Sequence, residues 1–187
     1  MPDMGDLSLP HGLWLAAYVA MLAAACWTDV SRAKIPNALT FSGMGLGLAF
    51  ASLPSGIGPG WAALGLVVGG AVPMLLHRLG VLGGGDVKLF AAIGAFVGLP
   101  HVLVVLLFTF AAGGLLAIAA ALFARRLRAV LSNVRDGLTQ MAGTLLLLRR
   151  IPDGRSIPVT AQRVPYALAI AAGALYHLFY MHEALLT

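Results

Sequence analysis

The sequence predicts an all-α, polytopic membrane protein, and three observations support this fold class. Hydrophobic residues make up 60% of the 187 positions, charged residues only 10%, and the mean hydropathy is +0.92. A soluble domain carries about 25% charged residues. The apolar residues gather in long segments, separated by short stretches that contain Pro, Gly or basic residues. Glycine is frequent, at 23 residues, which suits helices that pack closely in lipid.

The apolar segments predict six transmembrane helices within one integral membrane domain over residues 1–187. They cover residues 12–28, 38–53, 61–79, 87–99, 102–124 and 164–186. We expect the first to be a retained helix, because no Lys or Arg precedes it as in a signal peptide. The fourth is short, about 20 Å of helix against a hydrocarbon core of about 30 Å. We therefore expect Asp86, just before it, to lie below the interface in a wet pocket of the bundle.

The basic residues predict the orientation. All twelve Lys and Arg residues fall on one side of a six-span arrangement, and the positive-inside rule makes that side the cytoplasm. Both termini are then outside. The loop over residues 125–163 is cytoplasmic, and from Leu131 to Leu148 its apolar residues recur every three or four positions. This spacing predicts an amphipathic helix that lies on the membrane.

Two acids, Asp29 and Asp86, fall at the same predicted membrane border. An Asp near mid-membrane costs about 2.5–3.5 kcal/mol, so acids in such segments usually have a function. Two carboxyl groups a few Å apart share a proton. One can then take a proton from water while the other polarises a peptide carbonyl, as in aspartic proteases. A second interpretation is that both acids are topology-setting charges paired with Arg32, Lys34 or Lys88.

Three stretches of the chain carry a family resemblance. Gly83–Leu89, GGGDVKL, resembles the GxGDxK[L/F] motif of the type IV prepilin peptidases, which are GxGD intramembrane aspartyl proteases. Asp29–Asn37, DVSRAKIPN, resembles the first catalytic motif of that family, and Val164–Ala169, VPYALA, resembles the start of its last helix. The three stretches occur in the order of the family and extend over most of the chain.

The resemblance implies a prepilin leader peptidase of the bacterial cytoplasmic (inner) membrane, with its active site facing the cytoplasm. Such enzymes cleave the leader of prepilins or pseudopilins beside their hydrophobic helix, and they need no metal or organic cofactor. The resemblance makes Asp29 and Asp86 the catalytic pair. The residues expected to bind substrate or support the site are Gly83, Gly84, Gly85, Lys88, Arg32, Lys34, Pro36 and Asn37.

The chain resembles the short form of this family, which is associated with Flp/Tad-type pili. Longer members carry a cytoplasmic domain with paired Cys-x-x-Cys motifs and also N-methylate the new pilin terminus. Here the first two apolar segments are joined by a short connection, and Cys26 is the single cysteine. The short form implies a peptidase without the methyltransferase function. One cysteine also excludes an internal disulfide or a Cys-based zinc site.

Two other functions fit parts of the pattern. A non-enzymatic membrane subunit of a pilus-assembly or transport system would use the acids for packing or an ion path. A GxGD protease could also act on other membrane peptides. Nucleic-acid binding is disfavoured, because orientation and anionic headgroups explain the Arg-rich loop. The five histidines show no metal-binding spacing and are expected near the membrane interfaces: His11, His77, His101, His177 and His182.

Overall fold

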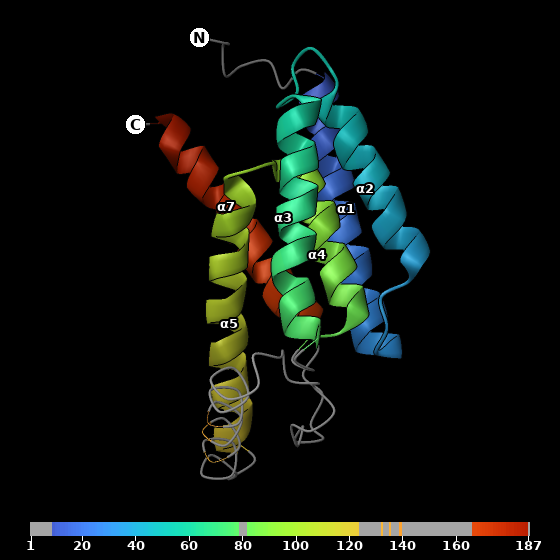
Figure 1. The fold of residues 1–187 in the computed structure, drawn as a ribbon. Coiled ribbons are helices and arrows are strands. Elements are labelled where there is room, and N and C mark those ends of the chain that lie inside the picture. The colour runs from blue at the N-terminus through green and yellow to red at the C-terminus, as the bar shows by residue number, and fades with distance from the viewer. Residues whose placement is uncertain are drawn as a thin grey trace.

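The computed structural model describes residues 9–78, 82–123 and 166–186, together with Ser132, Arg135 and Thr139. Within these residues the chain is all-helical, which confirms the predicted class. Six helices alternate in direction, so that α1 begins and α7 ends at the same end of the bundle (Figure 1). They are α1 (Leu9–Arg32), α2 (Asn37–Ala51), α3 (Pro59–Arg78), α4 (Gly84–Val97), α5 (His101–Phe123) and α7 (Tyr166–Leu186).

Three of the helices are long and apolar enough to cross a membrane by length and composition. These segments are Pro10–Arg32, Pro59–Arg78 and His101–Ala119, while Asn37–Ala51 and Tyr166–Tyr180 are apolar but shorter. Helix α4 has 14 residues, about 21 Å of helix. The protein is therefore membrane-embedded, whereas six complete spans and the orientation of the termini stay predictions.

The helix boundaries differ from the expected ones by up to four residues, and two of the differences concern the acids. Helix α1 continues to Arg32, so Asp29 lies inside its last turn and not after its end. Helix α4 begins at Gly84, three residues earlier than expected, because the Asp86 carboxylate accepts the Gly83 N–H and stabilises the first turn. The expected amphipathic helix of residues 131–148 lies outside the described residues, apart from the three isolated positions named above.

Helix α4 is the buried centre of the bundle. Every residue from Leu89 to Gly98 is buried. Helix α3 approaches it backbone to backbone, since a Cβ on Gly94 would overlap the carbonyl oxygen of Gly65, and the reverse also holds. Helix α2 does the same at Gly47, where a Cβ would lie 2.8 Å from the Ala95 carbonyl carbon. Small residues permit this close approach. In lipid the hydrophobic effect does not drive helices together, so the van der Waals packing at such contacts holds them instead.

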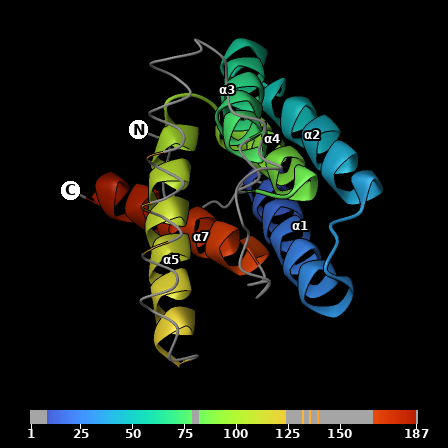
Figure 2. The same ribbon diagram turned by 60° about the horizontal axis from the view of Figure 1, so that its bottom comes forward.

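Helices α5 and α7 form a second unit beside this core. They cross with Gly173 of α7 directly against Thr109 of α5. Figure 2 shows α7 running across α5 and beginning beside α1. Because α7 contacts both α5 and α1, its first residues connect the two parts of the bundle at the end where α1 terminates.

The glycine contacts predict the effect of one added methyl group. Gly94→Ala should lower the free energy of unfolding by about 1–3 kcal/mol, because the methyl group has no room against the α3 backbone. Gly45→Ala is the matched control, since a Cβ there meets nothing within 4 Å. It should stabilise α2 by about 0.5–1 kcal/mol. Denaturation of both variants in detergent measures the difference, and equal stabilities would contradict the packing described.

Candidate active site

Asp29 and Asp86 lie at one end of the bundle. Asp29 is in the last turn of α1, and Asp86 is the third residue of α4. Helix α1 ends, and α4 and α7 begin, at this same end (Figures 1 and 2). The two acids are therefore placed at the same border of the bundle, as the alternation of the apolar segments predicts.

Asp86 is buried and held by the backbone just before it. Its side chain is 9% exposed, and its Oδ2 accepts a hydrogen bond from the Gly83 N–H at 3.0 Å. Gly83 itself is extended, with φ −74° and ψ 150°, and its carbonyl accepts the Val87 N–H. A carboxylate in the first turn is also stabilised by the helix dipole, by about 0.3–1 kcal/mol. These contacts fix the direction of the Asp86 carboxylate.

Asp29 is held by a residue 138 positions further along the chain. Its Oδ2 accepts a hydrogen bond from the Ala167 N–H at 3.0 Å. Ala167 is buried in the first turn of α7, whose N–H groups have no partners within the helix. One turn before Asp29, the Cys26 thiol donates to the Ala167 carbonyl at 3.5 Å. Helix α1 thus holds both backbone polar groups of one residue in α7.

Tyr166, the first residue of α7, precedes Ala167 at the same junction. The ring packs against α5, where a Cβ on Gly113 would lie 2.8 Å from both the Cε2 and the hydroxyl of Tyr166. Adjacent residues at the start of α7 therefore contact two different helices, Tyr166 packing on α5 and Ala167 bonding to Asp29 of α1.

The glycines before Asp86 make room for neighbouring segments. A Cβ on Gly85 would lie 3.1 Å from the Cβ of Ile35, a buried residue of the α1–α2 connection. A Cβ on Gly84 would lie 3.7 Å from the His77 ring, which is an ordinary contact. The His77 Nδ1–H donates to the Leu82 carbonyl at 2.8 Å and so supports the chain just before Gly83. Gly85 therefore permits the α1–α2 connection to reach the first turn of α4.

Lys88 ties α4 to the start of α2. Its Nζ donates to Asn37 Oδ1 at 2.8 Å and lies 5.4 Å from the centroid of the Phe41 ring. Pro36 immediately precedes α2, and its carbonyl accepts the Thr40 N–H. Lys88, Asn37 and Pro36 thus brace the connection that follows Asp29. Lys88 therefore supports the site by donating a hydrogen bond to the amide oxygen of Asn37.

Arg32 and Lys34 are placed differently from the other expected site residues. Both are exposed, Arg32 at the end of α1 and Lys34 in the connection after it. Between them, Ala33 adopts φ +49°, a left-handed conformation that ends the helix. The hydrogen bonds described for the two carboxylates come from backbone N–H groups of Ala167 and Gly83.

Two contributions were missed by reasoning from the sequence: the Ala167 N–H and the buried Ile35. Tyr166 and Ala167 belong to the VPYALA stretch, which marked a helix start without assigning any role to its residues. Cys26 gave the only local signal, because it precedes Asp29 by one helical turn and faces the same way. Among the described residues, no group of three or more His, Cys, Asp or Glu could hold a metal ion.

The fold and the site define a helical, membrane-embedded protein in which two acids lie at one end of the bundle. Residues 16–118, more than half of the chain, match the type IV leader peptidase family, and the chain belongs to this family. Both Asp29 and Asp86 fall within the matched residues. The comparisons with curated proteins and with solved structures find no match. Family membership makes the chain a membrane-embedded protease.

The hydrogen bond between Asp29 and Ala167 predicts different effects for two substitutions. Asp29→Ala should lower the free energy of unfolding by about 1–3 kcal/mol, because it leaves the buried Ala167 N–H without its acceptor. Asp29→Asn should stay close to the wild type, since the amide oxygen can accept the same hydrogen bond. Thermal unfolding in detergent compares the two, and an equal loss in both would show that charge dominates over the hydrogen bond.

Proposed function

We propose that the protein removes the leader peptide of a type IV prepilin or pseudopilin at the cytoplasmic border of the inner membrane, using Asp29 and Asp86 as a catalytic pair. The observation that carries this proposal is the placement of both acids at the end of the bundle where α1 ends and α4 and α7 begin, with Asp29 bonded to Ala167 and Asp86 to Gly83. It occurs in a chain that belongs to the type IV leader peptidase family. The family gives the reaction class, and the placement of both acids at one end of the bundle supports the proposed pair.

The proposed mechanism is general acid–base catalysis by two carboxyl groups that share one proton. The ionised carboxyl takes a proton from water, whose oxygen attacks the carbonyl carbon of the scissile peptide bond. The protonated carboxyl donates to the carbonyl oxygen. When the tetrahedral intermediate collapses, the C–N bond breaks, the leaving amine takes the proton that the first carboxyl removed from water, and a hydroxyl of the intermediate returns its proton to the second carboxylate. Because two coupled carboxyls titrate as one unit, the roles belong to the pair. No metal or organic cofactor takes part in these steps.

The exposure of the glycines suits an extended peptide substrate. Gly83 and Gly84 are exposed, whereas Asp86, two residues after Gly84, is buried. Glycines without side chains let a substrate backbone approach a buried carboxylate closely. The hydrophobic helix of the substrate would remain in lipid while the bond to be cleaved reaches this end of the bundle. A leader that precedes a single apolar helix, as in prepilins, has this geometry.

The short connection between α1 and α2 supports a Flp-like substrate class. Only residues 33–36 separate the two helices, and Ile35 of this connection is packed against Gly85. The Cys26 thiol donates a hydrogen bond to the Ala167 carbonyl. These features fit a peptidase that lacks the Cys-rich domain of the longer family members. Membership of a peptidase family speaks against the alternative of a non-enzymatic subunit.

Replacing either acid tests the proposed pair. Asp29→Asn and Asp86→Asn should each reduce leader removal by at least about a thousandfold, because an amide cannot share the proton. The measurement is the gel shift of a co-expressed Flp-type prepilin, with membrane insertion of each variant checked by fractionation. Asp153→Asn, a change of the same kind within the Arg-rich stretch, is the control and should cleave normally. A variant at Asp29 or Asp86 that inserts and cleaves at the wild-type rate would refute the pair.

Adjacent glycines provide a second test, of how the site is positioned. Gly85→Ala should slow cleavage by about tenfold, because its Cβ would push Ile35 and the connection that follows Asp29. Gly84→Ala is the comparison variant, since its Cβ would make only ordinary contact with His77, so that it tests substrate approach without the packing change and should slow cleavage less. Initial rates with the same prepilin compare them. Slower cleavage by Gly84→Ala than by Gly85→Ala would assign the glycine requirement to substrate approach and not to packing.

A further inference from the structure

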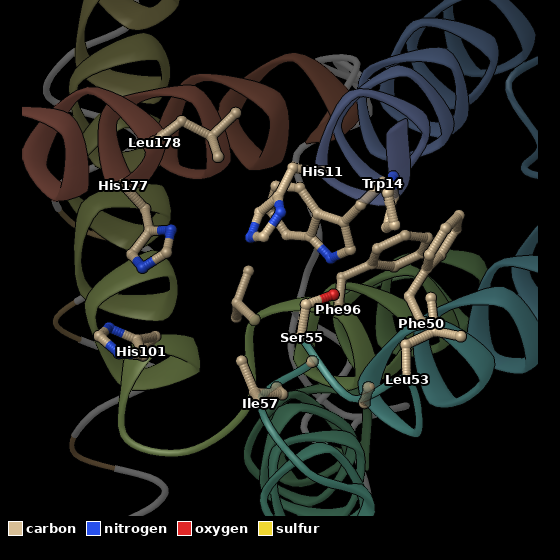
Figure 3. Close-up of a pocket in the computed structure, with 14 residues that line it drawn as sticks. His11, Trp14, Phe50, Leu53, Ser55, Ile57, Phe96, His101, His177 and Leu178 are labelled. Carbon is tan, nitrogen blue, oxygen red and sulfur yellow. The ribbon is translucent and has the colours of Figure 1, made fainter. Parts of the chain in front are cut away.

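A cavity lies at the opposite end of the bundle from Asp29 and Asp86. Its volume is about 330 Å³, and it is bordered by the beginning of α1, the α2–α3 turn, the end of α4 and the start of α5. His177 and Leu178 of α7 close it on the remaining side (Figure 3). The cavity therefore lies at the seam between the α1–α4 core and the α5–α7 unit, and the proposed reaction does not use it.

One wall of the cavity is aromatic. Trp14, Phe50 and Phe96 line it, with Trp14 and Phe96 in edge contact at a centroid distance of 6.1 Å. Phe50 lies against the other side of Phe96, at 6.3 Å. These rings come from three helices, and Figure 3 shows them grouped on one side of the cavity. Such a wall suits a flat, apolar ligand body, because rings stack in offset or edge geometry.

The opposite wall carries a buried imidazole without a partner. His177 is 4% exposed, and neither of its ring nitrogens has a hydrogen-bond partner among the described residues. His101 packs edge-on against it, at a centroid distance of 5.2 Å, without satisfying either nitrogen. In Figure 3 the His177 ring is directed into the cavity. Burying a polar group without a hydrogen bond is costly, so such a group needs an explanation.

The residues that line the cavity favour an uncharged ligand. No Asp, Glu, Lys or Arg is present among the residues that line the cavity. A charge on His177 or on a ligand there would be buried without compensation, which costs far more than a neutral hydrogen bond. A neutral imidazole offers one donor and one acceptor. The matching group is therefore a hydroxyl or a carbonyl.

The volume sets the size of the ligand. An apolar cavity of about 150 Å³ accommodates benzene, so twice that volume accommodates about two fused rings. We propose that this cavity binds a neutral, lipid-soluble aromatic molecule of two-ring size, whose hydroxyl or carbonyl group hydrogen-bonds to His177. The site is separate from the acids and does not depend on the proposed peptidase mechanism.

The test compares 2-naphthol with naphthalene, which differ only in the hydroxyl group. Vesicles that contain the full-length protein are dialysed to equilibrium against protein-free vesicles of the same lipid, and the bound probe is measured by its own fluorescence. We expect one saturable site, with 2-naphthol bound about tenfold more tightly than naphthalene, as one buried hydrogen bond provides. His177→Phe should bind both probes equally, and His177→Gln should retain the preference, since its amide keeps a donor and an acceptor.

A cavity-filling variant provides the reference for non-specific uptake. Ser55 points into the cavity from the α2–α3 turn (Figure 3), so Ser55→Phe should abolish saturable binding of both probes. Leader cleavage should be unchanged in all three variants, which separates this proposal from the peptidase function. The proposal is overturned if the wild type binds no more probe than Ser55→Phe. It is equally overturned if the wild type binds both probes alike, as an acyl-chain site would, or if His177→Phe keeps the preference.

Discussion

The contact between α4 and its two neighbours through glycine is the constraint on which the rest of the structure depends. Gly94 of α4 and Gly65 of α3 leave no space for a methyl group, and Gly47 of α2 is equally close to α4. In lipid, such close approach supplies the packing energy that holds helices together. It also encloses α4, a helix of only 14 residues, so that Asp86 in its first turn is buried within the bundle.

The hydrogen bonds of the two acids serve structure and chemistry together. Asp29 satisfies a backbone N–H at the start of α7, and Asp86 satisfies the N–H of Gly83. A carboxylate that accepts such a bond is fixed in direction, and preorganised groups are what a catalytic pair requires. The start of α7 is therefore a packing junction that also holds Asp29, which couples the position of α7 to the chemistry we propose.

The two ends of the bundle differ in chemical character. One end contains the two carboxylates, the exposed glycines and the Lys88–Asn37 contact, and this polar surface suits the backbone of a peptide substrate. The other end contains a partly open aromatic cavity, and the imidazole of His177 is the unsatisfied group among the described residues that line it. The helices that bear the acids also border this cavity, since α1 carries Trp14 and α4 carries Phe96.

The sequence by itself determined the helical, membrane-embedded class, the places of the helices within a few residues, and the common end of Asp29 and Asp86. Hydropathy can be read from neighbouring residues, and it predicts the helices. Because successive apolar segments alternate in direction, it also predicts that Asp29 and Asp86 lie at the same end. Only the tertiary structure decided that Asp29 binds Ala167, that Gly85 accommodates Ile35, and that α4 begins at Gly84. The first two contacts join residues that are far apart in the chain, so they form only when the helices pack together. The start of α4 depends on the single hydrogen bond from the Gly83 N–H to Asp86.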